Sequence, residues 1–486
     1  MSIDHFSTAT AMLKALRRRD ISSAELVQLH VARIEAHDGQ LNAIPVQTFD
    51  RARQAAERAD ERLAAGDRAP LLGLPMTLKE STLVAGLPQS AGILSFKDDV
   101  PGSDGPIATN VFKAGACLLG KTNIPIALGD WQADSPVYGR TNNPWDLSRT
   151  PGGSTGGGSA ALAAGMTPLE VGSDIGGSIR IPAAYCGVYG HRPSESAIPK
   201  SGQFPKEDLP NPASLMSVQG PLARSAVDLE LLFDVLIGPE PGEDTGWKLD
   251  LPQSRHQRLA DFRVALLPPP LGVKVAASMQ ARLEELVSFL SRQGALVAEA
   301  APPFNLEDYF HDYLRLLSAI VSIRTPREER ELQAAKLRQT GYPPSLARAD
   351  GLEMDAVAYV MLVDRRERAR LAWRDFFRDW DVVLTPMALD VAFPHQEAAV
   401  EDRMLMVDQQ SVRYGANILY AMLSIFAGLP STAFPGGLSP EGLPLGLQAI
   451  GPYLEDRTTL KFAQLVEAAW YRFEPPPFSK PPVAPP

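Results

Sequence analysis

The sequence predicts a single α/β domain in which a mixed β-sheet is covered by helices on both faces. Short apolar runs that suit buried strands alternate along the chain with stretches of helical periodicity. Hydrophobic residues make up 45% of the 486 residues and charged residues 21%, a composition that allows a sizeable globular core. No repeat of solenoid length interrupts the pattern, so one α/β domain accounts for the chain.

Residues 1–65 are expected to form the N-terminal helical part of this domain. Their apolar residues recur at helical spacing, namely Leu13, Leu16, Leu26, Leu29 and Ile34. The run Ser22-Ser23-Ala24-Glu25 is a capping signal that marks the start of a helix. We interpret this segment as a scaffold.

Residues 66–473 are expected to form the catalytic core. Four apolar runs predict strands, at residues 71–78, 116–119, 264–267 and 382–384. Residues 238–257 are rich in proline, glycine and acidic residues and predict a surface connection. Residues 474–486 form a proline-rich C-terminal tail, which we expect to be an extended, polyproline-like strap.

Charge and composition argue against several functional classes. The chain carries 47 Lys and Arg against 57 Asp and Glu, and its longest basic block is Arg17-Arg18-Arg19, so nucleic acid is not an expected partner. No secretory leader or long apolar stretch is recognisable, so we expect a cytoplasmic protein without a membrane anchor. Because Cys117 and Cys186 lie far apart and the histidines form no ligand pair, we expect buried free cysteines and neither metal nor cofactor.

One glycine-rich string matches the phosphate-binding loop G-x-x-x-x-G-K-[ST] in full, beginning at Gly115 and ending at Thr122. A nucleotide-binding protein is therefore an alternative of another class. Such a loop needs a strand before its first glycine and a helix at its lysine. Here residues 110–114 have the pattern of a helix end and residues 117–119 that of a strand. We therefore expect Lys121 at a strand end, either at the surface or supporting the site.

A second string, Gly152-Gly153-Ser154-Thr155-Gly156, matches the nucleophile elbow G-x-S-x-G of α/β-hydrolases, with His191 or His395 as a base. That elbow requires a buried strand just before it. The preceding TNNPWDLSRTP is polar and broken by prolines, which argues against a strand. Under this alternative Ser154, and not Ser178, would be acylated.

The third glycine-rich stretch, residues 151–183, indicates hydrolysis of amide-type bonds. It places two glycine-flanked serines, Ser154 and Ser178, in one segment, and an isolated lysine, Lys79, ends an apolar strand elsewhere. An amide requires a nucleophile, a proton donor for the amine and donors for the oxyanion. Since histidines are few, a lysine is the natural base, provided that burial lowers its pKa from about 10.4 toward about 7–8.

These residues suggest a specific hypothesis. Neutral Lys79 accepts a proton from Ser154, which in turn deprotonates Ser178 as it attacks the carbonyl carbon. The glycines before the nucleophile let backbone N–H groups approach the carbonyl oxygen as an oxyanion hole, formed by Ile175, Gly176, Gly177 and Ser178. Asp174 and Arg180 would brace this loop, or form a structural ion pair.

At these same positions the sequence resembles the amidase signature family, over nearly the whole chain from about Leu13 to Trp470. The landmarks are GLPMTLKE at 73–80, LLGKTN at 118–123, NNPWD at 142–146, the glycine- and serine-rich stretch at 151–183, GPLARS at 220–225 and GLPLGLQAIG at 442–451. The resemblance implies one α/β/α domain around a large twisted mixed sheet. It also implies Ser178 as nucleophile, Ser154 preceded by a cis peptide bond, and Lys79 as base.

The resemblance carries over residue by residue to a supporting set around the triad, namely Ser173, Asp174, Arg180, Gly153 and Thr155. Ser173 corresponds to a position where the family often has a hydroxyl near the triad. Two positions depart from the family pattern: Thr155 replaces a usual Ser or Gly, and Glu170 replaces a usual small residue. We expect both departures to affect pocket shape or packing more than activity.

The resemblance leaves the substrate open. The family includes fatty acid amide hydrolases, peptide and aryl amidases, nylon-oligomer hydrolases, carbamate-cleaving enzymes and the amidotransferase subunit that serves glutaminyl-tRNA synthesis. Three segments are expected to shape the pocket: Asp130-Trp131-Gln132, residues 308–324 with Tyr309, Phe310 and Tyr313, and residues 404–420. Their apolar and aromatic residues favour a small hydrophobic or aryl amide, anilide or carbamate, with urethane or ester cleavage as a side activity.

Two further alternatives remain at this point. An amidotransferase subunit would release ammonia from glutamine beside partners that bind tRNA. A non-catalytic binding protein would resist labelling by a serine-directed acylating probe. A monomer and a homodimer are both compatible with the sequence.

Overall fold

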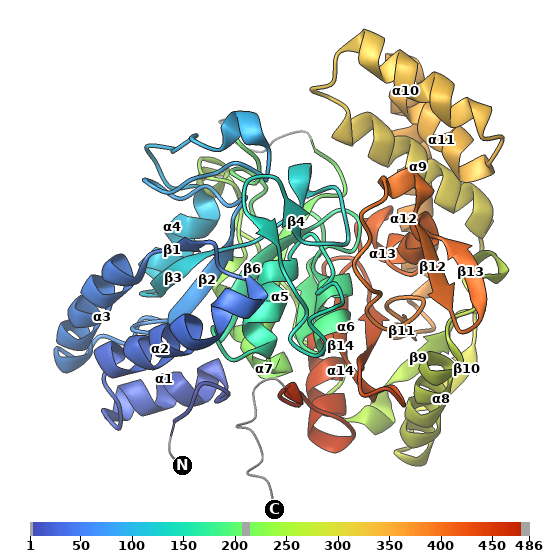
Figure 1. Ribbon diagram of the computed structural model, residues 1–486. Coiled ribbons are helices and arrows are strands. Elements are labelled where there is room, and N and C mark those ends of the chain that lie inside the picture. Colours follow the sequence, from blue (N-terminus) through green and yellow to red (C-terminus); the bar gives the residue numbers. More distant parts are fainter. Residues whose placement is uncertain (1–2, 207–213, 478–486) are drawn as a thin grey trace, which may run out of the picture.

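Eleven strands of the described chain form one mixed sheet (Figure 1). The computed structural model describes residues 3–206 and 214–477. The strands are β1 (Val46–Gln47), β2 (Pro75–Lys79), β3 (Cys117–Thr122), β6 (Leu169–Asp174), β7 (Tyr189–Arg192), β8 (Val218–Ala223), β9 (Arg263–Leu266), β10 (Leu296–Glu299), β11 (Val382–Pro386), β14 (Ser431–Leu438) and β15 (Pro444–Ile450). Within these ranges, two small hairpins stand outside the sheet, β4 (Asp134–Ser135) with β5 (Gly139–Arg140), and β12 (Met404–Val407) with β13 (Gln410–Arg413).

The strand order is β1-β3-β2-β6-β8-β7-β14-β15-β11-β9-β10. Parallel pairs lie toward both ends, where β3, β2 and β6 run together and β11, β9 and β10 run together. The middle of the sheet, from β6 through β8, β7, β14 and β15 to β11, is antiparallel. The four predicted strands are confirmed as β2, β3, β9 and β11.

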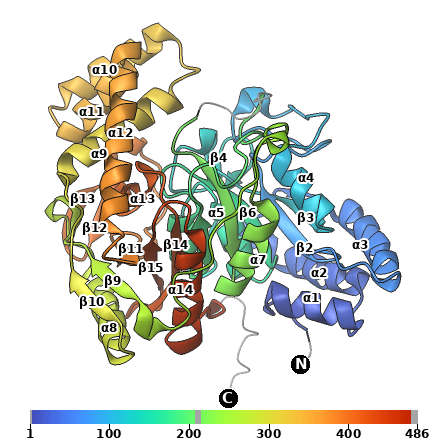
Figure 2. The ribbon, with the colours of Figure 1, turned by 180° about the vertical axis from the view of Figure 1, so that it is seen from behind.

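Helices cover both faces of the sheet, as predicted. They are α1 (Ala9–Arg18), α2 (Ser23–Leu41), α3 (Phe49–Ala64), α4 (Pro106–Lys113), α5 (Gly156–Ala163), α6 (Arg180–Cys186), α7 (Ala226–Leu236), α8 (Ala277–Arg292), α9 (Leu306–Val321), α10 (Arg327–Gln339), α11 (Pro343–Leu352), α12 (Ala356–Phe376), α13 (Met422–Ile425) and α14 (Asp456–Ala469). Helices α5 and α6 lie in front of the sheet in Figure 1, and α7 and α14 lie in front of it in the reverse view of Figure 2.

The N-terminal helices are part of the same core. Ser22 and Glu25 form the predicted capping box at the start of α2. The N–H groups of Ala9 and Thr10 donate to the Asp228 carboxylate of α7, at 2.8 and 2.9 Å, which ties α1 to the sheet-covering helix. The N-terminal segment is therefore helical, as its periodicity predicts.

The surface connection, the C-terminal tail and the helical extension compare differently with what the sequence predicts. Residues 238–257 connect α7 to β9 along the surface with only short 3₁₀ turns, as predicted. The tail beyond residue 477 lies outside the described residues. Helices α9–α12 form a helical extension at one end of the molecule (Figure 1), which no sequence pattern predicted as a unit. No helix in the described ranges is both long and apolar enough to cross a bilayer.

Candidate active site

Lys79 ends strand β2 in the middle of the parallel part of the sheet and is 1% exposed. Its Nζ donates to Ser154 Oγ at 2.7 Å and to Ser173 Oγ at 2.9 Å. Burial lowers the pKa of Lys79 to about 7, against the charges of Asp174 and Glu170, which act to raise it. A substantial fraction of Lys79 is therefore neutral near pH 7, as a general base requires.

Ser154 precedes α5, and the peptide bond between Gly153 and Ser154 is cis, as the resemblance implies. A Cβ on Gly153 would lie 2.4 Å from the Asp130 carbonyl oxygen, so only glycine permits this close approach. No strand of the described chain leads into Ser154, which argues against the nucleophile elbow. The candidate base His191 instead contacts Thr432 and Asp456, and His395 contacts Asn142.

Ser178 lies in the loop between β6 and α6 and is 6% exposed. The Thr155 N–H donates to the Ser178 carbonyl oxygen at 3.1 Å, which holds the two serine segments side by side. Within residues 3–206 and 214–477 no hydrogen bond joins the Ser154 and Ser178 hydroxyls. The structure thus brings Lys79, Ser154 and Ser173 into direct contact and places Ser178 beside them.

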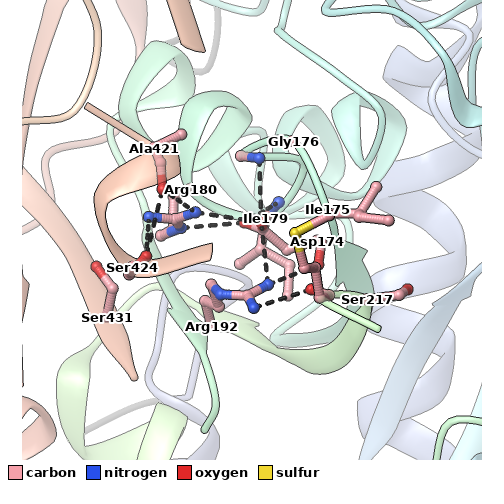
Figure 3. Close-up of polar contacts among 12 residues, drawn as sticks. Asp174, Ile175, Gly176, Ile179, Arg180, Arg192, Ser217, Ala421, Ser424 and Ser431 are labelled. Carbon is pink, nitrogen blue, oxygen red and sulfur yellow. Dashed lines mark hydrogen bonds and ion pairs between the residues drawn. The ribbon is translucent and has the colours of Figure 1, made fainter. Parts of the chain in front are cut away.

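Asp174 anchors the loop that carries Ser178. Figure 3 shows Arg180 and Arg192 converging on its carboxylate, at 3.1 Å from Arg180 Nε and 3.5 Å from Arg192 Nη1. Burial alone would raise the pKa of Asp174, but the two guanidinium groups outweigh it and lower the pKa to about 2. Asp174 is therefore ionised, and it fixes the loop through charge-assisted hydrogen bonds.

The loop N–H groups divide into two sets. Gly177 N donates to Asp174 Oδ1 at 3.0 Å, and Gly177 has a φ of 85° that a side chain would strain. Within the described ranges, no hydrogen bond engages the N–H groups of Ile175, Gly176 or Ser178. Gly177 thus shapes and anchors the loop, and the other three N–H groups are the candidate oxyanion donors.

The segment Asp130-Trp131-Gln132, which was expected to shape the pocket, contacts this loop through Trp131. Trp131 Nε1 donates to the Gly176 carbonyl oxygen at 3.0 Å, and its ring lies 5.0 Å from that of Tyr414. Asp130 accepts from Tyr414 Oη at 2.5 Å and from Arg403 at 2.5 Å. Gln132 exchanges two hydrogen bonds with the Gln396 backbone, both 2.9 Å. Residues 404–420 thus reach the site through Trp131.

The three aromatic residues of α9 have different positions. Tyr309 is buried and donates to the Leu423 carbonyl oxygen at 2.8 Å, and its ring stacks on Phe304. Phe310 is also buried in the hydrophobic core. Tyr313 is the member that reaches the site, because its hydroxyl donates to the Ile175 carbonyl oxygen at 3.2 Å. Core packing therefore accounts for the first two residues.

The phosphate-loop alternative is wrong. Gly115 follows α4, and Lys121 lies within strand β3, the reverse of the strand-loop-helix order that binds phosphate. Lys121 is at a strand end, as expected, but it is buried and not at the surface. Its Nζ donates to the Pro88 carbonyl oxygen, and burial lowers its pKa to about 8.

Arg192 is the principal residue of the site that was not predicted from the sequence. It lies in β7, is fully buried, and donates to the Asp174 and Met216 carbonyl oxygens at 2.7 and 2.9 Å. Strand β7 reads Tyr-Gly-His-Arg, which is not an apolar run, so no local pattern of the kind that marked Lys79 identifies Arg192. Both cysteines are free and buried, as expected.

Comparisons with known proteins match most of the chain. The Amidase family model matches residues 25–460. A glutamyl-tRNA(Gln) amidotransferase subunit from Synechococcus sp. is 32% identical, over 95% of this chain and 96% of its own. The indoleacetamide hydrolase of Bradyrhizobium diazoefficiens is 32% identical, over 91% of this chain and 82% of its own. The structure of 6-aminohexanoate cyclic dimer hydrolase superposes with a TM-score of 0.77 at 25% identity, covering 99% of this chain and 100% of its own.

Proposed function

Because the chain belongs to the amidase family and is an amide hydrolase, we propose that it cleaves C–N bonds through an acyl-enzyme on Ser178, with Ser154 as relay and Lys79 as base. The contact that carries this proposal is the 2.7 Å hydrogen bond between Lys79 Nζ and Ser154 Oγ, both fully buried. A lysine with a pKa of about 7 in direct contact with a serine hydroxyl is suited to proton transfer. Burying a lysine only to fill space would cost free energy, because its amine loses contact with water.

The reaction proceeds in two halves. Neutral Lys79 takes the Ser154 proton while Ser154 takes that of Ser178, and Ser178 Oγ bonds to the carbonyl carbon. The developing oxyanion accepts from the free N–H groups of the loop, at Ile175, Gly176 and Ser178. Ser154 then returns a proton to the amine nitrogen, the C–N bond breaks, and water releases the acyl group by the reverse relay.

The substrate that we propose is a hydrophobic or aryl amide, with aryl carbamates and esters cleaved by the same acyl-enzyme chemistry. The support is the partly exposed Trp131, packed on Tyr414 and hydrogen-bonded to the loop that precedes the nucleophile. An aromatic surface at this point favours an apolar acyl or amine group over a small polar one. The similarity to an indoleacetamide hydrolase agrees with this class, because indoleacetamide joins an aromatic ring to an amide.

The experiment that tests the proposal compares wild type with Ser178→Ala, Ser154→Ala and Lys79→Ala. Each protein is incubated with an aryl anilide or an aryl carbamate, and covalent adducts are measured by intact-protein mass spectrometry. We expect the acyl adduct to vanish in Ser178→Ala and to form at least about 100-fold more slowly in the other two variants. An adduct that survives in Ser178→Ala but not in Ser154→Ala would show that Ser154 is the nucleophile.

A glutamine amidotransferase subunit is the second candidate, favoured by the 32% identity to the Synechococcus protein. The same preparation separates the two candidates when it receives glutamine. Hydrolysis of the anilide by the chain alone, at least tenfold above glutamine in kcat/KM, supports the amidase. Glutaminase activity that exceeds anilide hydrolysis, or that needs added partner subunits, would replace it with the amidotransferase.

A further inference from the structure

A carboxyl group lies buried in the sheet beneath the candidate catalytic residues and has no part in the mechanism above. Glu170 on β6 is the register partner of Thr77 on β2, two residues before Lys79. Helix α5 passes directly over it, and a Cβ on Gly158 would lie 2.6 Å from Glu170 Cδ. The glycine-rich start of α5 therefore makes room for a large polar side chain where a small residue would otherwise suffice.

The Glu170 carboxyl is only half satisfied. Its Oε1 accepts from Thr122 Oγ1 of β3 at 2.7 Å, while Oε2 is buried without a partner in the described chain. The hydroxyls of Thr155 and Ser159, one turn apart on α5, are likewise buried and unpaired among the described residues. A lone unpaired carboxylate oxygen is costly unless the group carries a proton or meets water.

Lys79 is the charged group that acts on Glu170. The neighbours that face it from β2, β3, α5 and β8, namely Thr77, Thr122, Gly158 and Leu222, are uncharged. The charged group from β2 is Lys79, and Asp174 on β6 itself acts on Lys79 in turn. Burial raises the pKa of Glu170 to about 7, against the side chains of Thr77 and Thr122 and the charge of Lys79, which act to lower it. Glu170 and Lys79 thus titrate over the same pH range, and each charge shifts the pKa of the other.

We propose that Glu170 is a positioning residue of the reaction, because its buried carboxyl shares one proton with Lys79 and so sets the pH above which that lysine acts as a base. The inference rests on the proposed function. With a single proton on the pair, the state that has neutral Lys79 and protonated Glu170 is competent, and the ion pair is not. The carboxylate therefore holds Lys79 protonated to a higher pH than the serine network alone would.

The test measures the rate at which a fluorophosphonate probe labels Ser178, between about pH 5 and pH 9, by intact-protein mass spectrometry. This readout needs no knowledge of the natural amide. For wild type the labelling rate should rise with pH around a midpoint near the pKa of about 7 of Lys79. Glu170→Gln keeps the shape and the acceptor for Thr122 but removes the charge, and should lower that midpoint by about one pH unit.

A second variant and a matched control complete the experiment. Thr122→Val removes the hydrogen bond that favours ionised Glu170, so it should move the midpoint the same way, and it carries the test should Glu170→Gln not fold. Glu467, whose pKa burial also raises to about 7, lies on α14 away from the site, so Glu467→Gln should leave the midpoint unchanged.

The outcomes separate the two proposals. A midpoint that stays at the wild-type value in Glu170→Gln, or a uniform loss of rate at every pH, makes Glu170 a packing residue and leaves the proposed function intact. Absence of Ser178 labelling in folded wild type at every pH overturns the proposed function and this inference with it.

Discussion

At the scale of single residues, two tryptophans make the same contact in different places. Trp131 Nε1 donates to the Gly176 carbonyl oxygen at 3.0 Å, and Trp145 Nε1 donates to the Cys186 carbonyl oxygen at 2.9 Å. The first contact holds the loop just before Ser178, whereas the second holds the far end of α6. Comparing variants of the two tryptophans therefore separates an effect on the reaction from the general loss of stability when an indole hydrogen bond is removed.

We predict that Trp131→Phe lowers kcat for an aryl anilide about tenfold, because one hydrogen bond of about 1.4 kcal/mol no longer fixes the Gly176 carbonyl. Trp145→Phe should lose comparable stability and keep kcat within about twofold. Steady-state kinetics and urea unfolding of both variants check this. Equal kcat values in the two variants would mean that Trp131 does not position the loop.

The candidate site could be predicted in part, and the reason differs by residue. Lys79 and the two serines were predicted because each stands out from its local sequence, and the family resemblance assigned their roles. Contacts that join distant parts of the chain were not predicted, such as the hydrogen bond between Tyr414 and Asp130 across 284 positions. Local pattern carries no information on such pairs, because the fold alone decides which segments meet.

At the scale of elements, the four strands that were predicted carry apolar runs, whereas most of the strands that were missed do not. Strand β2 is buried at every position and reads as an apolar run. Strand β1 has two residues, and β14 contains Pro435 and Gly437 at a register shift, so neither has the composition of a strand. The order of the strands is set by long-range pairing, which the spacing of motifs does not reveal.

Helices α7 and α14 are joined by a carboxyl group that gives an element-scale prediction. Glu467 of α14 accepts from the N–H of Ala226, at the start of α7, at 2.8 Å. Burial raises the pKa of Glu467 from 4.5 to about 7. A raised folded-state pKa means that the stabilising contribution is complete below about pH 4.5 and is lost as pH rises through about 7.

Glu467→Gln keeps the acceptor and removes this titration. The free energy of unfolding of Glu467→Gln minus that of wild type should therefore rise by roughly 2 kcal/mol from pH 5 to pH 8. This is less than the full pKa shift of Glu467 would give, because its side chain is partly exposed. Urea unfolding at the two pH values measures the difference. A stability gap that is independent of pH would show that Glu467 does not titrate differently in the folded protein.

At the scale of the whole molecule, one hydrophobic core joins the N-terminal helices, the catalytic strands and the C-terminal helix. The same cluster of buried residues contains Leu16 of α1, Met76 of β2 and Val466 of α14. The sheet is continuous from β1 to β10, so no seam separates the segment before residue 65 from the rest. Such a protein should unfold as one cooperative unit.

Leu16 lies on α1, in the N-terminal helical segment, and its side chain is 1% exposed. We therefore predict that Leu16→Ala lowers the free energy of unfolding of the whole domain, catalytic strands included, by roughly 3 kcal/mol. In urea, the far-UV circular dichroism of the helices, the tryptophan fluorescence and the labelling of Ser178 should be lost together. The urea midpoints of all three should move by the same amount relative to wild type. Leu332→Ala, in a side chain 58% exposed on α10, is the matched control and should move none of them. Labelling that persists after the helix signal has fallen would mean that the N-terminal helices fold as a separate unit, because only then could the catalytic strands outlast the packing of α1.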